Sequence, residues 1–307
     1  MRRYSRWLPI LALACVTPAL ADTAAGLAAY ERGDYATALK EYQAGAERHD
    51  PAAYSGLGLM YEHGAGVPMD DAKAAEWFRK AADSGDATGQ SNLGTMYLMG
   101  KGVPQDYRAA FDLFTKAAAQ GDDAAENNLG MLYAAGDGVP VDLEKAFFWR
   151  LKAATQGLAP AQYSVAQMYA NGTGVAANDT EAFAWYQKSA LQGFAPAEAD
   201  LGIMYITGRG VPTDDAKAIM WFRKAATQGN ADGLLNLGMA YLSARGVSQD
   251  YNLAFVMMSL SATEGNERAV AFRDRLAGML TPAQKSAADA MISAWHPGMK
   301  LPGSTEQ

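Results

Sequence analysis

Histidine is the side chain that most often carries acid-base chemistry or ligates a metal, and this chain has three: His49, His63 and His296. Their separations do not match any metal-binding motif. Cys15 is the single cysteine, so the chain can form no disulfide within itself. We therefore expect the histidines to lie at the solvated surface, and we predict no metal, no cofactor and no catalytic residue.

Lys101, which lies between two glycines, is the nearest approach to a phosphate-binding loop. It lacks the Gly-x-x-x-x-Gly-Lys-Ser/Thr order and the strand that should precede such a loop. Equivalent loops elsewhere in the chain have Ala65, Asp137 or Thr173 in place of the lysine. Phosphate binding is therefore not predicted.

Carboxylates gather where helices are expected to begin. Asp122, Asp123 and Glu126 form one cluster, and stabilisation by the helix dipole explains them better than general acid chemistry. A second set has one Asp or Asn in each copy of a recurring loop: Asp70, Asp106, Asp142, Asn178, Asp214 and Asp250. A short acceptor at this place caps the following helix, so we interpret these six residues as caps.

The loop lysine, the acidic cluster and the six caps belong to a unit that recurs six times with a period of 36 residues. Its Gly-x-Gly-Val loop begins at Gly64, Gly100, Gly136, Gly172 and Gly208, with Ala244 in the sixth copy. A fixed period of this size is typical of stacked two-helix units, none of which can bury its apolar face alone. We expect the second glycine of each loop to have a positive φ and to end the first helix.

The first helix of each copy, helix A, has small and aliphatic residues and a tyrosine on one stripe. The aliphatic position is followed at once by glycine or alanine and holds Leu57, Leu93, Leu129, Val165, Leu201 and Leu237. The second helix, helix B, begins after the cap and alternates alanine with large residues. Its large positions include Phe78, Phe114, Trp149, Trp185, Trp221 and Met257. Small residues opposite large ones let paired helices interdigitate at close range.

This unit resembles the Sel1-like repeat, a relative of the tetratricopeptide repeat that is lengthened by a Gly-x-Gly-Val-Pro loop. In one copy the matching residues are Leu93, Gly94, Tyr97, Gly100, Gly102, Val103, Pro104, Asp106, Ala110, Phe114, Ala117, Ala118 and Gly121. The resemblance implies an all-α, right-handed α/α superhelical solenoid with capping helices at both ends. It also implies an adaptor for other proteins.

The two ends of the repeat array are expected to differ from its middle. We assign residues 22–50 to a degenerate N-terminal cap, 51–265 to six repeats of 36 residues, 266–296 to C-terminal capping helices, and 297–307 to a disordered tail. Thr281 and Gln284 predict a capping box, with Pro282 at the first helical position.

The N-terminus has the order of a secretory signal peptide, with arginines before the apolar run 8–16 and Ala19-Leu20-Ala21 before Asp22. The run is too short to span a membrane. We predict a signal peptide over residues 1–21, cleavage after Ala21, no transmembrane segment in the mature chain, and a periplasmic or secreted protein. The alternative is a lipid anchor at Cys15, although Ala12 stands where such sites usually have leucine.

The charge of the chain argues against nucleic acid as a partner. The net charge is −7, and loss of the signal-peptide arginines would make it still more negative. A stripe of helix-B lysines, Lys80, Lys116, Lys152, Lys188 and Lys224, is interpreted as a solvated face.

The resemblance also implies a binding face on the concave side, formed by helix-A positions that vary between copies. The predicted partner-binding residues are Tyr163, Gln167, Ile203, Ile206, Leu235, Met239 and Leu242. Their apolar members suggest a groove for an apolar peptide or helix. The alternative is that they are buried by the curvature of the repeats or beneath the C-terminal helix.

We therefore expect an exported, non-enzymatic adaptor for a protein or peptide partner, with a role in envelope signalling or assembly. A secreted factor that binds a host protein is one alternative. A cell-wall hydrolase or another enzyme is a second, although the chain shows none of the usual catalytic parts.

Overall fold

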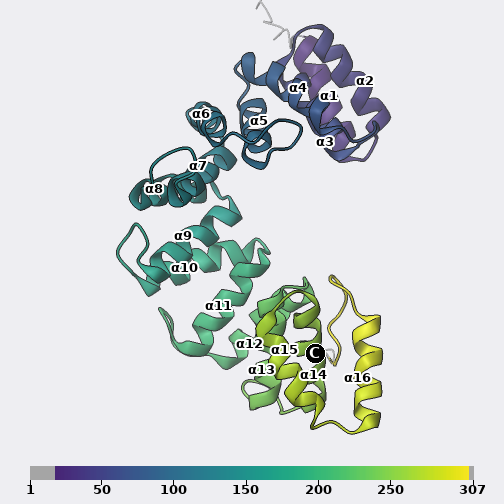
Figure 1. Cartoon of the computed structure of the whole chain (residues 1–307), viewed down its shortest axis with the longest axis vertical. Helices are drawn as coiled ribbons and strands as arrows, with labels where there is room; N and C mark the ends of the chain where they lie inside the picture. Colours follow the sequence, from purple (N-terminus) through teal and green to yellow (C-terminus); the bar gives the residue numbers. More distant parts are fainter. Residues whose placement is uncertain (1–17, 304–307) are drawn as a thin grey trace, which may run out of the picture. The chain divides into compact units, whose positions relative to one another are not determined.

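The protein is described from a computed structural model that covers residues 18–303, and within that range it consists of sixteen α-helices with no strand (Figure 1). The predicted all-α fold is confirmed. Residues 1–17, which hold Cys15 and most of the predicted signal peptide, lie outside the described residues. The chain divides into two compact units, Met1–Ala125 and Glu126–Gln307.

The first unit contains the N-terminal helix pair and the first two repeats. Its helices are α1 (Pro18–Glu31), α2 (Tyr35–Glu47), α3 (Pro51–His63), α4 (Asp71–Asp83), α5 (Ala87–Met99) and α6 (Tyr107–Ala118). Consecutive helices pack on each other throughout this set, beginning with α1 on α2. The unit ends within the first turn of α7 (Asp123–Ala135).

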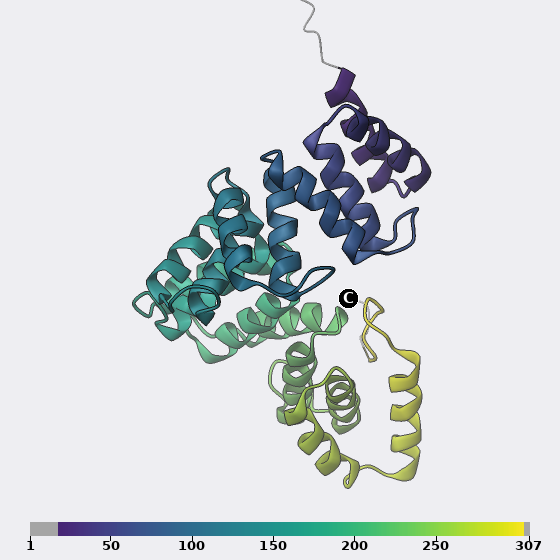
Figure 2. The ribbon, with the colours of Figure 1, turned by 45° about the horizontal axis from the view of Figure 1, so that its top comes forward.

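The second unit contains the rest of α7 and all later helices. These are α8 (Leu143–Gln156), α9 (Ala159–Asn171), α10 (Asp179–Leu191), α11 (Ala195–Thr207), α12 (Asp215–Thr227), α13 (Ala231–Ser243), α14 (Tyr251–Thr263), α15 (Glu267–Ala277) and α16 (Pro282–Ala294). From α8 to α15 each helix packs on the next, and α16 packs on α14 (Figure 2).

Close packing within a repeat depends on the glycine that follows the helix-A leucine. A Cβ on Gly94 would lie 2.8 Å from the ring of Phe114, and one on Gly202 would lie 2.5 Å from the ring of Phe222. Both rings are essentially inaccessible to solvent. Burial of each such side chain contributes about 1.5 to 3 kcal/mol, so the glycine of helix A and the aromatic residue of helix B form one packing unit.

The loops end helix A slightly earlier than the sequence pattern suggests. The capping residue in the left-handed region is the first loop residue, as at Gly100 with φ 68° and Ala244 with φ 57°. The second glycine, which we expected to end the helix, also has a positive φ but lies beyond the cap, as at Gly102 with φ 65°. The six predicted N-caps are confirmed, because each accepts a hydrogen bond from a backbone N–H of the helix-B first turn.

Glutamines near the end of helix B connect successive repeats. Gln192 Nε2 donates to Gln162 Oε1 at 2.8 Å and to the Gly157 carbonyl at 2.8 Å. Gln120 makes the same two contacts in the first unit, with Gln90 and Gly85. The ends of neighbouring B helices are thus held together by a side-chain amide.

The C-terminal end is more ordered than predicted. The capping box of Thr281 and Gln284 is present at the start of α16. The predicted disordered tail is wrong for residues 297–303, because Leu301 is only 6% exposed and the Gly298 N–H donates to the Thr227 carbonyl at 2.7 Å. Apolar residues allow this segment to pack back onto the helices, while residues 304–307 lie outside the described range.

Candidate functional site

The predicted partner-binding residues lie on α9, α11 and α13 of the second unit, and six of the seven are half-buried. We call the surface that these six form the helix-A surface: Tyr163, Gln167, Ile203, Ile206, Met239 and Leu242. Ile203, Ile206, Met239 and Leu242 pack against the core cluster of this unit with part of each side chain accessible.

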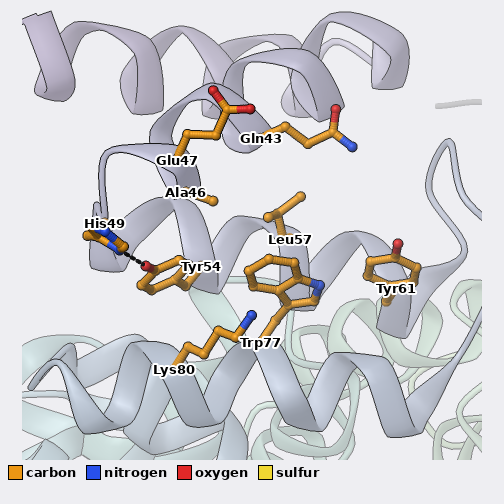
Figure 3. Close-up of a pocket in the computed structure, with 9 residues that line it drawn as sticks. All are labelled: Gln43, Ala46, Glu47, His49, Tyr54, Leu57, Tyr61, Trp77 and Lys80. Atoms are coloured by element: carbon orange, nitrogen blue, oxygen red, sulfur yellow. Dashed lines mark hydrogen bonds between the residues drawn. The ribbon is translucent and has the colours of Figure 1, made fainter.

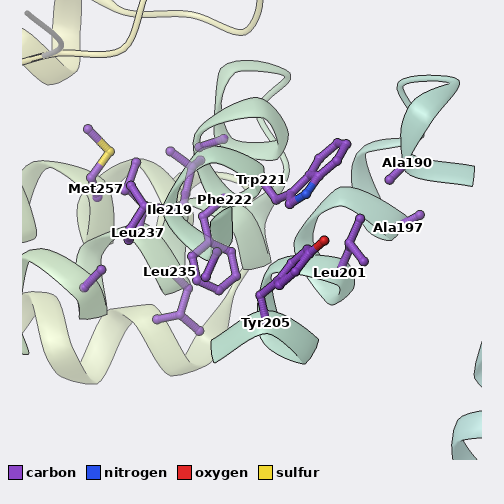
Figure 4. Packing of buried hydrophobic residues seen from close by; sticks show 14 of the residues in the cluster. Ala190, Ala197, Leu201, Tyr205, Ile219, Trp221, Phe222, Leu235, Leu237 and Met257 are labelled. Carbon is purple, nitrogen blue, oxygen red and sulfur yellow. The ribbon is translucent and has the colours of Figure 1, made fainter. Parts of the chain in front are cut away.

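Leu235 does not belong to this surface, and its prediction as a partner-binding residue is wrong. The residue is 2% exposed and lies in the core cluster that also contains Phe222 (Figure 4). Its repeat position is turned toward the start of the next helix A, as two equivalent serines show: Ser55 donates to Asp86 at 2.6 Å and Ser91 donates to Asp122 at 3.0 Å.

A polar cluster lies at the α9 end of the helix-A surface. Gln167 Nε2 donates to the phenol oxygen of Tyr163 at 2.9 Å. The phenols of Tyr163 and Tyr186 lie near enough to the carboxylate of Asp200 to favour its charged form, and the two rings are 5.7 Å apart. Helices α9, α10 and α11 therefore contribute side chains to one hydrogen-bonded group.

Burial controls the protonation of this cluster. It raises the pKa of Asp200, an effect that the two phenol hydrogen bonds oppose and the charge of Asp232 reinforces. Burial likewise raises the pKa of Tyr163 and of Tyr186 well above the usual range, with the charge of Asp200 adding to the effect. Both phenols therefore stay neutral at physiological pH, and the cluster offers oriented donors and acceptors rather than an activated nucleophile.

The sequence contained a signal for this cluster that we did not use. Asp200 is the one carboxylate at its repeat position, where the other copies have Gly56, Asn92, Asn128, Ser164 and Asn236. Tyr186 likewise adds a hydroxyl at a position that holds phenylalanine in three copies. A departure from the repeat at two positions that meet in space indicates a local role.

Two arginines in the loops beside this surface form ion pairs with aspartates of the preceding repeat. Arg209 pairs with Asp179 at 2.6 Å and donates to the Ala170 carbonyl at the end of α9. Arg245 repeats the arrangement one copy later with Asp215, at 3.0 Å. A small cavity of about 50 Å³ lies where Arg209, Asp200 and Ile203 meet, so the polar cluster and the apolar part of the surface are adjacent.

A larger cavity of about 550 Å³ lies in the first unit, between α2 and the α3–α4 pair (Figure 3). Its walls include Tyr54 and Trp77, whose rings stack with centroids 5.8 Å apart, and Lys80, whose ammonium lies 3.9 Å from the Trp77 ring centroid. His49 at its rim bonds the Tyr54 hydroxyl at 2.9 Å and has φ 60° at a position that is glycine in every later copy. Our expectation of a merely solvated histidine missed this contact.

The glutamine connection between B helices is missing beside this cavity. The position of Gln90 is occupied by Tyr54, and that of Gln120 by Ser84, whose hydroxyl bonds its own helix. In place of the glutamine contact, the Tyr54 hydroxyl bonds His49.

The described residues, 18–303, contain no group of three or more His, Cys, Asp or Glu side chains placed to hold a metal ion. Within the same range, no helix is long and apolar enough to cross a membrane.

A family model described as Sel1 repeat matches the chain in six consecutive segments: residues 51–86, 87–122, 123–158, 159–194, 195–230 and 231–266. Among solved structures, the chain is similar to c5321, a protective antigen of uropathogenic Escherichia coli, with 33% identity, 89% of this chain and 68% of that chain covered, and a TM-score of 0.58. A Sel1 repeat protein from Oxalobacter formigenes is 27% identical over 78% of this chain and 96% of its own, with a TM-score of 0.71. No protein with a curated description matches the chain.

Proposed function

The chain belongs to the Sel1 repeat family, and we propose that it is an exported, non-catalytic adaptor that binds a protein partner on the helix-A surface. Repeat solenoids of this kind typically mediate protein–protein interactions. The partner is a peptide segment or helix whose apolar side chains pack on Ile203, Ile206, Met239 and Leu242, while its polar groups bond the cluster around Asp200. We propose a role in envelope signalling or assembly, which fits an exported protein.

One observation carries this proposal: half-buried apolar side chains and a desolvated, hydrogen-bonded carboxylate lie next to each other on one face. Apolar anchors supply most of the binding free energy at protein interfaces, and buried polar groups supply orientation and specificity. Asp200 is already held by Tyr163 and Tyr186, so little side-chain entropy would be lost when a partner binds.

Export is supported by the arginines, the apolar run and the Ala19-Leu20-Ala21 sequence at the N-terminus. The similarity to a protective antigen of a pathogenic bacterium favours a second candidate function, in which the same surface binds a host protein after secretion. The two candidates differ in the source of the partner and share the site.

Photo-crosslinking in intact cells tests the proposal. A photoreactive amino acid is placed at Met239 on the helix-A surface, and in a control at Met220, which is 44% exposed on the helix-B side. We expect a discrete crosslinked protein from position 239 that is absent from position 220. Identical products from both positions, or none from position 239, would contradict the proposed site.

A further inference from the structure

Arg150 occupies a position that belongs to the core in the other five repeats. The residues there are Phe78, Phe114, Tyr186, Phe222 and Met258, and each is 5% exposed or less. The third repeat alone places a charged side chain at this point of helix B. An arginine at a core position is unfavourable unless its charge is compensated.

The stem of Arg150 replaces the missing aromatic ring. A Cβ on Gly130 would lie 2.5 Å from Arg150 Cγ, just as one on Gly94 would lie 2.8 Å from the Phe114 ring. Because the side chain of arginine is longer, the guanidinium continues past α7 to α9, where Nη1 lies 3.8 Å from Met168 Sδ. The methylene groups of Arg150 thus pack where the other repeats have an apolar side chain, and the charged guanidinium lies beyond that packing site.

No carboxylate of the described residues forms an ion pair with this guanidinium, and Arg150 Nε is buried without a hydrogen-bond partner among them. Burial also lowers the pKa of Arg150. Buried carboxylates of the same unit, in contrast, have partners. Glu126 pairs with Lys152 at 2.7 Å, and Glu198 accepts from Gln228 at 2.8 Å. Arg150 therefore retains unused donor capacity in a partly desolvated place.

The guanidinium faces a pocket of about 170 Å³ that is lined by Ser164, Gln167, Met168, Asn171 and Thr173. Apart from Arg150, every polar side chain of this lining is neutral. The side chains of Asn171 and Thr173 make no hydrogen bond with the described residues. The pocket thus combines one cation with several neutral hydrogen-bonding groups.

We propose that this pocket binds a carboxylate of a peptide partner, with Arg150 as the bidentate donor. The inference rests on the proposed function and specifies the chemistry of the partner, because Gln167 belongs to both the pocket and the helix-A surface. A planar guanidinium fork matches the two oxygens of a carboxylate. The carboxylate belongs either to an Asp or Glu side chain or to the C-terminus of the partner.

A phosphate group fits this pocket less well. Phosphate carries up to two negative charges, whereas Arg150 is the one cation of the lining, and the chain as a whole has a net charge of −7. A monoanion is compensated by a single guanidinium without a second positive group.

The test is an NMR titration that follows the side-chain Nε–H signal of Arg150 in the mature chain. The probes are N-acetylglycine for a C-terminal carboxylate, N-acetylglutamate amide for a side chain, N-acetylglutamine amide as a neutral analogue, and inorganic phosphate. The exposed Arg223 is an internal control for nonspecific attraction of anions.

We expect a saturable shift of the Arg150 signal with at least one carboxylate probe, and the stronger of the two identifies the source. For ligands of so few atoms, the dissociation constant should be on the order of millimolar. The neutral analogue should cause no saturable shift, phosphate should bind more weakly, and Arg223 should show no saturable response. Equal or tighter binding of phosphate, or no saturable shift with either carboxylate, would overturn the assignment.

Two variants separate this role from a structural one. Arg150→Phe restores the residue of other repeats, so the melting temperature should be at least that of the wild type while shifts of the Gln167 and Asn171 amide signals with carboxylate disappear. Arg150→Lys keeps the charge but not the fork and should bind more weakly. A lower melting temperature for Arg150→Phe would show that the arginine is structural. The crosslink from position 239 is a separate readout, so failure of this inference leaves the proposed function testable.

Discussion

Gln167 Nε2 donates a 2.9 Å hydrogen bond to the phenol oxygen of Tyr163, and the Tyr163 phenol favours the charged form of the nearby Asp200 carboxylate. Because the amide supplies the donor to the phenol oxygen, the phenol hydrogen is free to point at the carboxylate. The hydrogen bond between Gln167 and Tyr163 fixes the direction of two side chains on the helix-A surface. Its place beside this pair makes Asp200 the group whose protonation affects both stability and recognition.

Asp200→Asn should stabilise the protein at neutral pH. Burial raises the pKa of Asp200 in the folded state, so the folded state binds the proton more tightly than the unfolded state. The aspartate protein therefore loses stability as pH rises from the unfolded pKa, near 3.8, through the higher folded pKa. Asparagine removes that loss and is the residue found at positions 92, 128 and 236.

Urea unfolding of the two proteins between pH 3 and pH 8 checks this prediction. The stability advantage of Asp200→Asn should grow as pH rises and then level off above the folded pKa. A difference that is independent of pH would mean that Asp200 titrates alike in the folded and unfolded states.

Leu235→Ala should cost about 2 to 5 kcal/mol in the free energy of unfolding, because it opens a cavity in a closed core. Leu191→Ala is the matched control, since Leu191 is 70% exposed on α10 and its truncation should cost less than about 0.5 kcal/mol. Denaturant unfolding measures both. A similar loss of unfolding free energy for the two variants would contradict the burial of Leu235.

The loop residues give a pair of opposite predictions. Ala244 has φ 57° where five copies have glycine, so Ala244→Gly should stabilise the protein by about 0.5 to 1 kcal/mol through relief of left-handed strain. At Gly210 a Cβ would lie 2.1 Å from the Asp179 carbonyl oxygen, so Gly210→Ala should cost more than about 1 kcal/mol. Thermal unfolding should move in opposite directions for the two variants.

The predicted signal peptide is tested by the mass of the protein recovered from its native cells. Cleavage after Ala21 gives an N-terminus at Asp22 and no lipid. A mass that corresponds to an N-terminus at Cys15 with acyl chains would instead establish the lipoprotein alternative.

The fold could be predicted from the sequence because the six repeat copies can be compared with one another. Six copies in register separate the positions that the fold requires, such as the caps at Asp106 and Asp142, from those that vary. Helix caps and loop glycines are determined by residues close to them in the sequence, so they can be predicted from the sequence. The order of residues 297–303 depends instead on distant partners such as Thr227, and the sequence near the terminus carries no sign of them.

The candidate site was predicted only in part. Tyr163 and Gln167 are half-buried, whereas Leu235, which occupies the same repeat position as Tyr163, is buried in the core cluster. Asp200, Tyr186 and Arg150 were missed because they sit at positions that we treated as scaffold. Comparison of the six copies marks Asp200 and Arg150 as departures from their repeat positions, but the sequence does not show which departures meet in space.

Recognition through the helix-A surface is tested most directly by calorimetric binding of the purified mature chain to the protein crosslinked from position 239. Wild type is compared with Met239→Lys on the helix-A surface and with Met220→Lys on the helix-B side. We predict that Met239→Lys weakens binding by at least about tenfold, equivalent to about 1.4 kcal/mol, and that Met220→Lys binds like wild type. Equal affinities for the two variants, with both folded by circular dichroism, would contradict recognition through the helix-A surface.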